Sequence, residues 1–290
     1  MITSQRGFTL VEAIMVIVII GVVGGMVAVF IRAPVQGYAD SVARAELSDT
    51  ADLALRRMAR DLRLALPNSI RVSGNSLEML ATRSGGRYLA ADDSVDTLPV
   101  LDFIDPANTS FTVVGAMPGA GELVTGSDYL VVNNLGEGYA PANAYDLASA
   151  QRNIALIAGA DATRKTLTLA DNPFAVQAPP APSASQRYQI VSGPVTYYCG
   201  LEADGVTRML TRQSGYAITS AQVANPVPAV GAARGQRSLM AGRVASCEFH
   251  YEKLASQRSA LVILALELQA RGGTGGSVRL VHQVHVDNTP

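Results

Sequence analysis

The chain has 290 residues, of which 48% are hydrophobic and only 16% are charged. This hydrophobic content excludes disorder over most of the chain. With 23 basic and 24 acidic residues the net charge is −1, so we expect no nucleic-acid partner held by phosphate neutralisation. Two cysteines are too few for a four-thiolate zinc or iron–sulfur site, and we expect no cofactor.

The first element in chain order is a long apolar run. No charged residue occurs from Ala13 to Ile31, and a helix of this length spans roughly 28 Å, about the thickness of a bilayer core. The run is longer than the core of a secretory signal peptide, and the Phe-Ile-Arg-Ala-Pro sequence of residues 30–34 contains no small-x-small cleavage site. The pattern predicts one membrane-spanning helix with a large domain on one side of the membrane.

Glu12 places a charge at the start of this helix. A lone charge at membrane depth costs about 2.5–3.5 kcal/mol or more and usually has a partner. One interpretation is therefore that Glu12 pairs with a cation on a neighbouring helix. The other is that its carboxylate snorkels to the nearby membrane surface.

Residues 7–12, Gly-Phe-Thr-Leu-Val-Glu, together with the apolar run resemble the class III signal of type IV prepilins and type II secretion pseudopilins. In that family a membrane aspartyl peptidase cleaves after the Gly and methylates the new N-terminal residue. The resemblance implies a leader peptide of residues 1–7, cleavage between Gly7 and Phe8, and N-methylation of Phe8. It also implies that Glu12 acts in subunit assembly by pairing with the Phe8 amine of a neighbour.

The chain departs from the major pilins at one position. They usually carry Pro at the twenty-second mature position, where this chain has Val29, and its nearest proline is Pro34. The helix break of major pilins in filaments is therefore expected to be displaced or absent.

An amphipathic helix is predicted from Tyr38 to Leu66. Apolar residues recur there at spacings of three and four, as in a helix with one face docked on a sheet, at Leu47, Ala51, Leu55, Met58 and Leu62. The other faces carry Arg44, Asp49, Asp52, Arg56, Arg57, Arg60, Asp61 and Arg63. Pro67 ends the helix, so we expect a transmembrane part, residues 8–31, and a stem, residues 32–66. The arginines form either a solvated face or a charged surface for a neighbouring subunit.

Residues 67–290 are expected to form a β-rich globular domain. Short alternating runs between Gly, Asn, Asp and Pro predict strands at Leu77–Thr82, Val100–Ile104, Phe111–Val114, Tyr129–Asn133, Ile154–Ala158, Leu167–Ala170, Tyr188–Val191, Val195–Leu201, Met209–Arg212, Val244–Tyr251, Ala260–Gln269 and Val278–Val286. Residues 272–276 predict a hairpin turn, and Pro173–Pro182 and Ser214–Gly242 predict surface loops. The fold class is therefore α+β and pilin-like, with a long N-terminal helix packed on antiparallel sheet.

A closer resemblance is carried by the end of the stem. Residues 58–71, Met-Ala-Arg-Asp-Leu-Arg-Leu-Ala-Leu-Pro-Asn-Ser-Ile-Arg, are similar to the O-type biogenesis proteins of the mannose-sensitive haemagglutinin (MSHA) pilus. Residues 195–199, Val-Thr-Tyr-Tyr-Cys, followed by 210–212, Leu-Thr-Arg, fit the same pattern. The Arg-Asp-Leu run is also similar to the J-type pseudopilins of type II secretion.

The two cysteines lie on the apolar faces of their predicted strands. Cys199 shares a face with Tyr197, and Cys247 shares a face with Phe249. In an oxidising periplasm we expect one Cys199–Cys247 disulfide. The alternative is two buried free thiols, as in a cytosolic protein.

We find no catalytic or metal constellation in the sequence. His282 and His285 point to opposite faces of one strand, so a metal site would need residues from different strands. There is no G-x-S-x-G motif, and Gly159–Thr166 lacks the Gly before Lys of a phosphate-binding loop. One polar strand face is either a solvated surface or a proton-shuttle or cation site, and it is formed by Glu248, His250 and Glu252.

The resemblance implies a structural subunit and not an enzyme. The expected function is that of a minor pilin in the assembly of an MSHA-type pilus, in a priming or tip complex. Expected partners are other minor and major pilins, the prepilin peptidase, the inner-membrane assembly platform and the membrane itself. The expected location is the inner membrane, single-pass, with the C-terminal domain in the periplasm. The alternatives are a type II secretion pseudopilin, an adhesive or ligand-binding pilus tip module, and a membrane-tethered enzyme.

Overall fold

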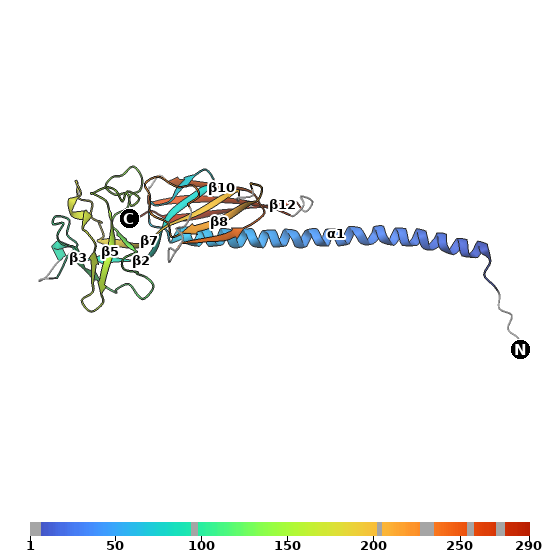
Figure 1. The fold of residues 1–290 in the computed structure, drawn as a ribbon, viewed down its shortest axis with the longest axis horizontal. Helices are drawn as coiled ribbons and strands as arrows, with labels where there is room; N and C mark the ends of the chain where they lie inside the picture. The colour runs from blue at the N-terminus through green and yellow to red at the C-terminus, as the bar shows by residue number, and fades with distance from the viewer. Residues whose placement is uncertain (1–6, 94–97, 202–204, 227–234, 254–257, 271–275) are drawn as a thin grey trace.

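The computed structural model describes residues 7–93, 98–201, 205–226, 235–253, 258–270 and 276–290. A long helix, α1 (Leu10–Arg63), extends from a domain of antiparallel strands and carries the N-terminus far from that domain (Figure 1). The predicted α+β class is therefore confirmed. Of the predicted leader peptide, only Gly7 belongs to the described residues, and residues 1–6 lie outside them.

α1 is continuous through Pro34. The helix break of major pilins is therefore absent from α1 and not displaced to Pro34. The helix ends at Arg63, slightly before the predicted Leu66, because the next residues join a sheet. Ala65 forms a β-bridge with Ala81, and the N–H of Leu66 donates to the carbonyl of Leu80 over 2.8 Å.

The strands form two sheets. The larger sheet contains β1 (Arg71–Ser73), β2 (Ser76–Tyr88), β3 (Ser110–Val114), β4 (Tyr129–Val131), β5 (Ile154–Asp161), β6 (Thr166–Leu169), β7 (Arg187–Leu201), β8 (Arg208–Ser214) and β9 (Gln236–Ala241). The smaller sheet contains β10 (Val244–Lys253), β11 (Ser259–Gln269) and β12 (Ser277–Asp287), in that order. Two short 3₁₀ helices occur in the connections of the larger sheet: Ala91–Asp93 between β2 and β3, and Pro173–Val176 between β6 and β7.

Six strands of the larger sheet close into a ring at the end of the domain farthest from the N-terminus (Figure 1). β2 pairs with both β3 and β7, and the order β2-β3-β6-β5-β4-β7 returns to β2 through antiparallel pairs. The ring encloses a core of its own, which includes Tyr88, Phe111, Leu130, Ile157, Leu167, Phe174, Tyr188 and Ile190. Closure removes the free edges that an open sheet of these strands would expose.

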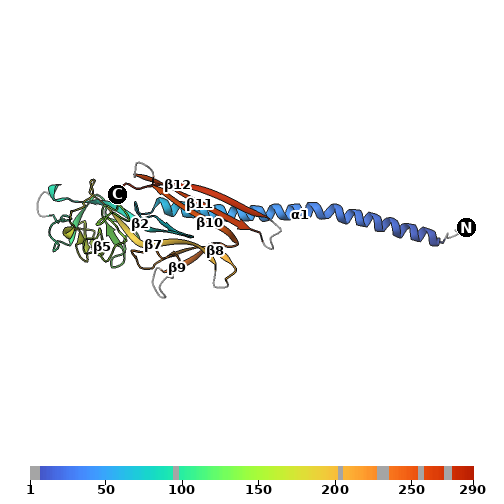
Figure 2. The ribbon, with the colours of Figure 1, turned by 90° about the horizontal axis from the view of Figure 1, so that it is seen from above.

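A second core joins the C-terminal half of α1 to both sheets (Figure 2). The predicted apolar face of the stem is confirmed, because each of its five residues is at most 2% exposed: Leu47, Ala51, Leu55, Met58 and Leu62. They pack with apolar residues of β2, β7 and β8 on one side and of β10, β11 and β12 on the other. Burying these side chains contributes roughly 1.5–3 kcal/mol for each large one, which fixes the stem to the domain.

The structure corrects the sequence prediction at two places between residues 100 and 201. Val100–Ile104 is not a strand, because Asp102 Oδ1 accepts hydrogen bonds from the N–H groups of Ile104 and Asp105 and turns the chain. Two predicted strands, Tyr188–Val191 and Val195–Leu201, are one strand, β7, which continues through Gly193 at φ +115°.

The loop predicted at Ser214–Gly242 contains strand β9, which pairs with β8. Strand β1, which the sequence analysis missed, pairs with β2 across a tight turn at Gly74 and Asn75. Residues 227–234 of the predicted loop and residues 271–275 of the predicted hairpin turn lie outside the described residues.

Candidate membrane and assembly site

The N-terminal half of α1 presents apolar side chains on every side. Its most apolar stretch is long enough to cross a membrane, and none of that stretch is buried in the structure. Ile17 is 70% exposed and Phe30 is 80% exposed, on a helix that the described domain does not touch there. An apolar surface of this extent needs a bilayer or neighbouring helices to cover it.

The start of α1 is capped by the side chain of Thr9. Thr9 is the N-cap residue, and its hydroxyl accepts a 3.3 Å hydrogen bond from the N–H of Glu12. The Thr-Leu-Val-Glu order of residues 9–12 has the spacing of a capping box, and the carboxylate lies in the first turn, where the helix dipole favours negative charge. Glu12 is exposed, and no cationic side chain in the described part of the chain pairs with it.

The predicted cleavage site lies just outside the helix. Gly7 and Phe8 precede the N-cap, and Phe8 is 76% exposed. The Gly7–Phe8 peptide bond therefore lies in accessible, non-helical chain. After cleavage at this bond, the new amine of Phe8 would stand directly before the capped first turn that carries Glu12.

At the other end of α1, Asp61 fixes the helix to the larger sheet. One oxygen of its carboxylate accepts hydrogen bonds from the hydroxyl of Tyr197 and from Nε of Arg212, both over 2.8 Å. Burial, with the Asp61 carboxylate close by, raises the pKa of the Tyr197 hydroxyl, so the phenol stays protonated and remains a donor. Asp61 was expected on an outer face of the stem, and its contact with the sheet corrects that expectation.

The sequence analysis missed a buried ion pair beside this junction. Arg71 and Glu78 are 6% and 1% exposed, and Nη2 of Arg71 donates to the carboxylate of Glu78 over 2.7 Å. The guanidinium lies 3.7 Å from the centroid of the Tyr145 ring. Burial raises the pKa of Glu78, and the charge of Arg71 opposes that rise.

Arg71 also holds two loops against the sheet. It donates to the carboxylate of Glu137 over 2.8 Å and to the carbonyls of Thr219 and Ser220 over 2.9 and 2.7 Å. The sequence contains a signal that could have revealed this ion pair, namely the Gly-Asn turn at residues 74–75. A two-residue hairpin there places Arg71 opposite Glu78.

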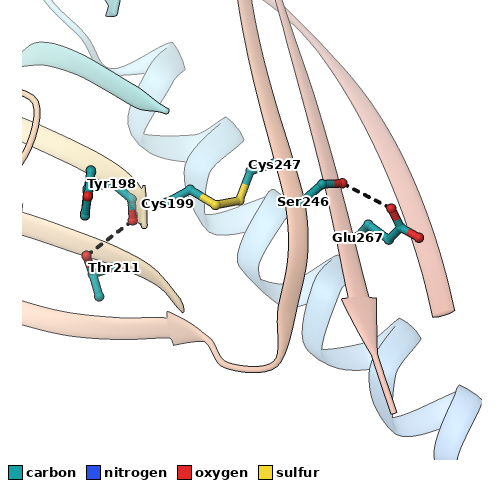
Figure 3. The surroundings of a disulfide bond; sticks show 6 residues. All are labelled: Tyr198, Cys199, Thr211, Ser246, Cys247 and Glu267. Carbon is teal, nitrogen blue, oxygen red and sulfur yellow. Dashed lines mark hydrogen bonds between the residues drawn. A yellow bond between two sulfur atoms is a disulfide. The ribbon is translucent and has the colours of Figure 1, made fainter. Parts of the chain in front are cut away.

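A disulfide joins the two sheets. Cys199 of β7 and Cys247 of β10 are bonded, with their Cα atoms 6.3 Å apart, in front of α1 (Figure 3). Cys199 is fully buried in the core that the stem shares with both sheets. Close by, Ser246 donates to the carboxylate of Glu267 over 3.1 Å, and hydrogen bonds from Ser277 and Ser246 hold the pKa of that carboxyl below its usual value.

The polar face of β10 is exposed to solvent. Glu248, His250 and Glu252 are all exposed, and Glu248 accepts a 3.0 Å hydrogen bond from Arg279 of β12. Within the described ranges, no three His, Cys, Asp or Glu side chains are placed to hold a metal ion. This arrangement favours the interpretation of a solvated sheet face.

A comparison with known protein families gives a match at the start of the chain. Residues 2–28 match the prokaryotic N-terminal methylation motif, which spans the Gly7–Phe8 bond, Glu12 and most of the apolar run. The match indicates a type IV pilin- or pseudopilin-like subunit that associates with pilus or pseudopilus components and is processed by a prepilin peptidase. No curated protein and no solved structure matches the chain.

Proposed function

We propose that the chain is a minor pilin that takes part in assembling an MSHA-type pilus, in a priming or tip complex. The observation that carries this proposal is the methylation motif at residues 2–28, placed on an apolar helix that the described domain leaves uncovered. The similarity of residues 58–71 to the O-type proteins supports an MshO-type subunit over a type II secretion pseudopilin.

In this proposal, residues 8–31 anchor the chain in the inner membrane and residues 67–290 lie in the periplasm. The disulfide between Cys199 and Cys247 supports the periplasmic side, because disulfides persist in oxidising compartments. The apolar face of the stem is buried against both sheets from Leu47 onward, so residues 32–46 of the helix separate the domain from the membrane anchor.

Glu12 provides the recognition step. The peptidase cleaves the exposed Gly7–Phe8 bond and leaves a cationic, methylated amine on Phe8. When two such helices lie side by side, the carboxylate of Glu12 in one pairs with the Phe8 amine of the other, and both charges are neutralised within lipid. The hydrogen bond that the N–H of Glu12 donates to the Thr9 hydroxyl keeps the first turn of α1 formed, which holds Glu12 in place for this contact.

The test is Glu12→Gln, with Asp40→Asn as the matched control on an exposed part of the same helix. Gln keeps the size of the side chain and leaves the backbone N–H that donates to Thr9 unchanged, so leader cleavage and membrane insertion should stay normal. Pilus number and co-purification with partner pilins should fall several-fold, because a neighbouring amine is left without its counter-ion in lipid. If Glu12 only snorkels to the membrane surface, neither quantity changes, and the pairing role is wrong.

A further inference from the structure

The connection between β4 and β5 is longer than the pairing of these strands requires. Val131 lies opposite Ile154, and a turn of about two to five residues could join paired neighbours of this kind. The chain instead uses residues 132–153, which form no helix or strand. Ordered connections of this length are uncommon in compact domains and usually have a function. This segment, the β4–β5 loop, is therefore a candidate binding element of the ring.

The β4–β5 loop is anchored to the chain that follows the stem. The side chain of Asn134 donates to the carbonyl of Pro67 over 2.7 Å and accepts from the N–H of Ala144 over 2.9 Å. The hydroxyl of Tyr145 donates to the carbonyl of Ser69 over 2.7 Å. Asn134 and Tyr145 are both at most 2% exposed. A surface built on these fixed points keeps its shape without a ligand, which lowers the entropic cost of binding one.

The β4–β5 loop shapes a small pocket with a volume of about 180 Å³. Every residue that lines this pocket belongs to the loop, and four of them carry polar side chains: Asn143, Asp146, Ser149 and Arg152. The volume is that of roughly six water molecules, which is enough for the end of one long side chain. The pocket therefore suits a small polar group and not a large cofactor.

The carboxylate of this pocket belongs to Asp146, which is half-buried. Among the described residues it has no ion-pair partner and no hydrogen-bond donor. Arg152 does not neutralise it, because Arg152 pairs with Asp171 and donates to the carbonyl of Ser149 over 3.3 Å. One carboxylate is too few for a calcium ion, which takes about six to eight oxygen ligands. The pocket therefore has one uncompensated negative charge, which suits a monovalent cationic group.

The ring that carries the pocket is acidic as a whole. The chain enters the ring after Thr82 and leaves it before Val191, and these two residues are paired with each other. Between them, residues 83–190 contain 11 acidic and 6 basic residues, a net charge of −5, whereas the rest of the chain has a net charge of +4. The field of the ring therefore attracts cations to the pocket and repels anions.

We propose that this pocket binds one cationic nitrogen group, the ammonium of a lysine or the guanidinium of an arginine. The carboxylate of Asp146 accepts the N–H groups of the ligand in charge-assisted hydrogen bonds, and the methylene groups of the ligand pack on Ala140 and Pro141. Two sources offer this chemistry, a basic side chain of a partner protein and a small soluble amine. The site lies on the ring, far from the apolar run and Glu12 (Figure 1), so it goes beyond the proposed assembly role.

Saturation-transfer difference NMR on the full chain in detergent tests the proposal, because the method detects weak ligands of large particles. The probes are N-acetyl-arginine amide and N-acetyl-lysine amide, with N-acetyl-norleucine amide as the uncharged analogue of the lysine probe. We expect both charged probes to bind at least about fivefold more tightly than the uncharged one, which is the contribution of one ion pair at a partly exposed site. Raised salt should reduce this difference.

Variants of Asp146 locate the binding. Asp146→Asn keeps the size of the side chain and removes its charge, so it should weaken the charged probes roughly five- to tenfold and leave the uncharged probe unchanged. Asp146→Glu keeps the charge and should retain most of the affinity. Asp92→Asn is the matched control, because it removes one exposed charge of the ring outside the pocket. Glu12→Gln should not change binding, which separates this site from the assembly role.

Butylamine distinguishes the two sources of the cation, since it carries the ammonium group without a peptide backbone. Tighter binding of the lysine probe supports a partner protein, and equal binding of butylamine supports a soluble amine. Four results overturn the proposal: equal binding of the uncharged probe, unchanged binding to Asp146→Asn, an equal loss in Asp92→Asn, and displacement of the charged probes by methyl glucoside. An equal loss in Asp92→Asn would mean that the probes sense only the overall charge of the ring.

Discussion

Nε of Arg212 in β8 donates a 2.8 Å hydrogen bond to Asp61, within the last turn of α1. The same carboxylate oxygen accepts the hydroxyl of Tyr197 in β7. These two hydrogen bonds join the helix to two strands. They restrict the orientation of the stem more than apolar packing does, because they fix both its rotation and its position along the helix axis. The direction in which α1 leaves the domain therefore depends on Asp61.

Asp61→Asn should destabilise the domain by about 1–2 kcal/mol. Hydrogen bonds to charged groups contribute roughly 1.5–3 kcal/mol, and the value is reduced here because both side chains are about one-fifth exposed. Urea unfolding of the full chain in detergent measures the change. Asp52→Asn, which removes a surface ion pair with Arg56, is the control and should change stability by less than about 1 kcal/mol. An equal effect of the two variants would show that Asp61 has no special role.

Reduction of the Cys199–Cys247 disulfide should destabilise the domain by about 4 kcal/mol. The bond closes a loop with a sequence separation of 48 residues, and the cost follows from the chain entropy released in the unfolded state. Cys199→Ser with Cys247→Ser should show the same loss without any reductant. Peptide mapping of membranes alkylated before lysis should show one bridged peptide pair, and two alkylated cysteines would contradict the bridge.

Arg71→Met should destabilise the domain by about 3–5 kcal/mol near neutral pH, because Glu78 is left as an uncompensated buried charge. Burial already raises the pKa of Glu78, and loss of Arg71 removes the influence that lowers it. The folded variant therefore binds a proton more readily than the unfolded chain. Its stability should rise as pH falls through the raised pKa of Glu78 toward the ordinary value of a glutamate.

The control for this pH dependence is Arg71→Met combined with Glu78→Gln. That variant has no carboxylate at position 78 to protonate, so it should lack the rise in stability at lower pH that the single variant shows. Urea unfolding at several pH values compares the variants. A single variant whose deficit does not shrink at lower pH would contradict the account of the ion pair.

The elements that local pattern determines could be predicted from the sequence. The stem is an example, because the spacing of Leu47, Ala51, Leu55, Met58 and Leu62 identifies the buried face without knowledge of its partner. β9 could not be found this way, since its sequence Gln-Arg-Ser-Leu-Met-Ala has little alternation and its pairing with β8 determines it. Val100–Ile104 shows the opposite case, in which four of five residues are apolar and favour a strand, but the Asp102 side chain accepts backbone hydrogen bonds and turns the chain.

The pairing of strands that lie far apart in the sequence could not be predicted. The six-stranded ring depends on β2 pairing with both β3 and β7, and no local feature of Ser76–Tyr88 specifies two partners. Asp61 likewise looked like one more charge on a solvated helix face until the positions of Tyr197 and Arg212 were known. The N-terminal motif was different, because its residues are contiguous and their spacing alone identifies it.

The most direct test of the central claim is mass spectrometry of the mature N-terminus of the protein from its native membrane. The account predicts a chain that begins at Phe8 with one methyl group on the amine and has a net charge of −2, since residues 1–7 remove one arginine from a chain of net charge −1. Gly7→Arg should leave the leader in place, because the peptidase of the family cleaves after Gly. A mature chain that begins near Ala33, or an unprocessed chain that still enters filaments, would contradict the account.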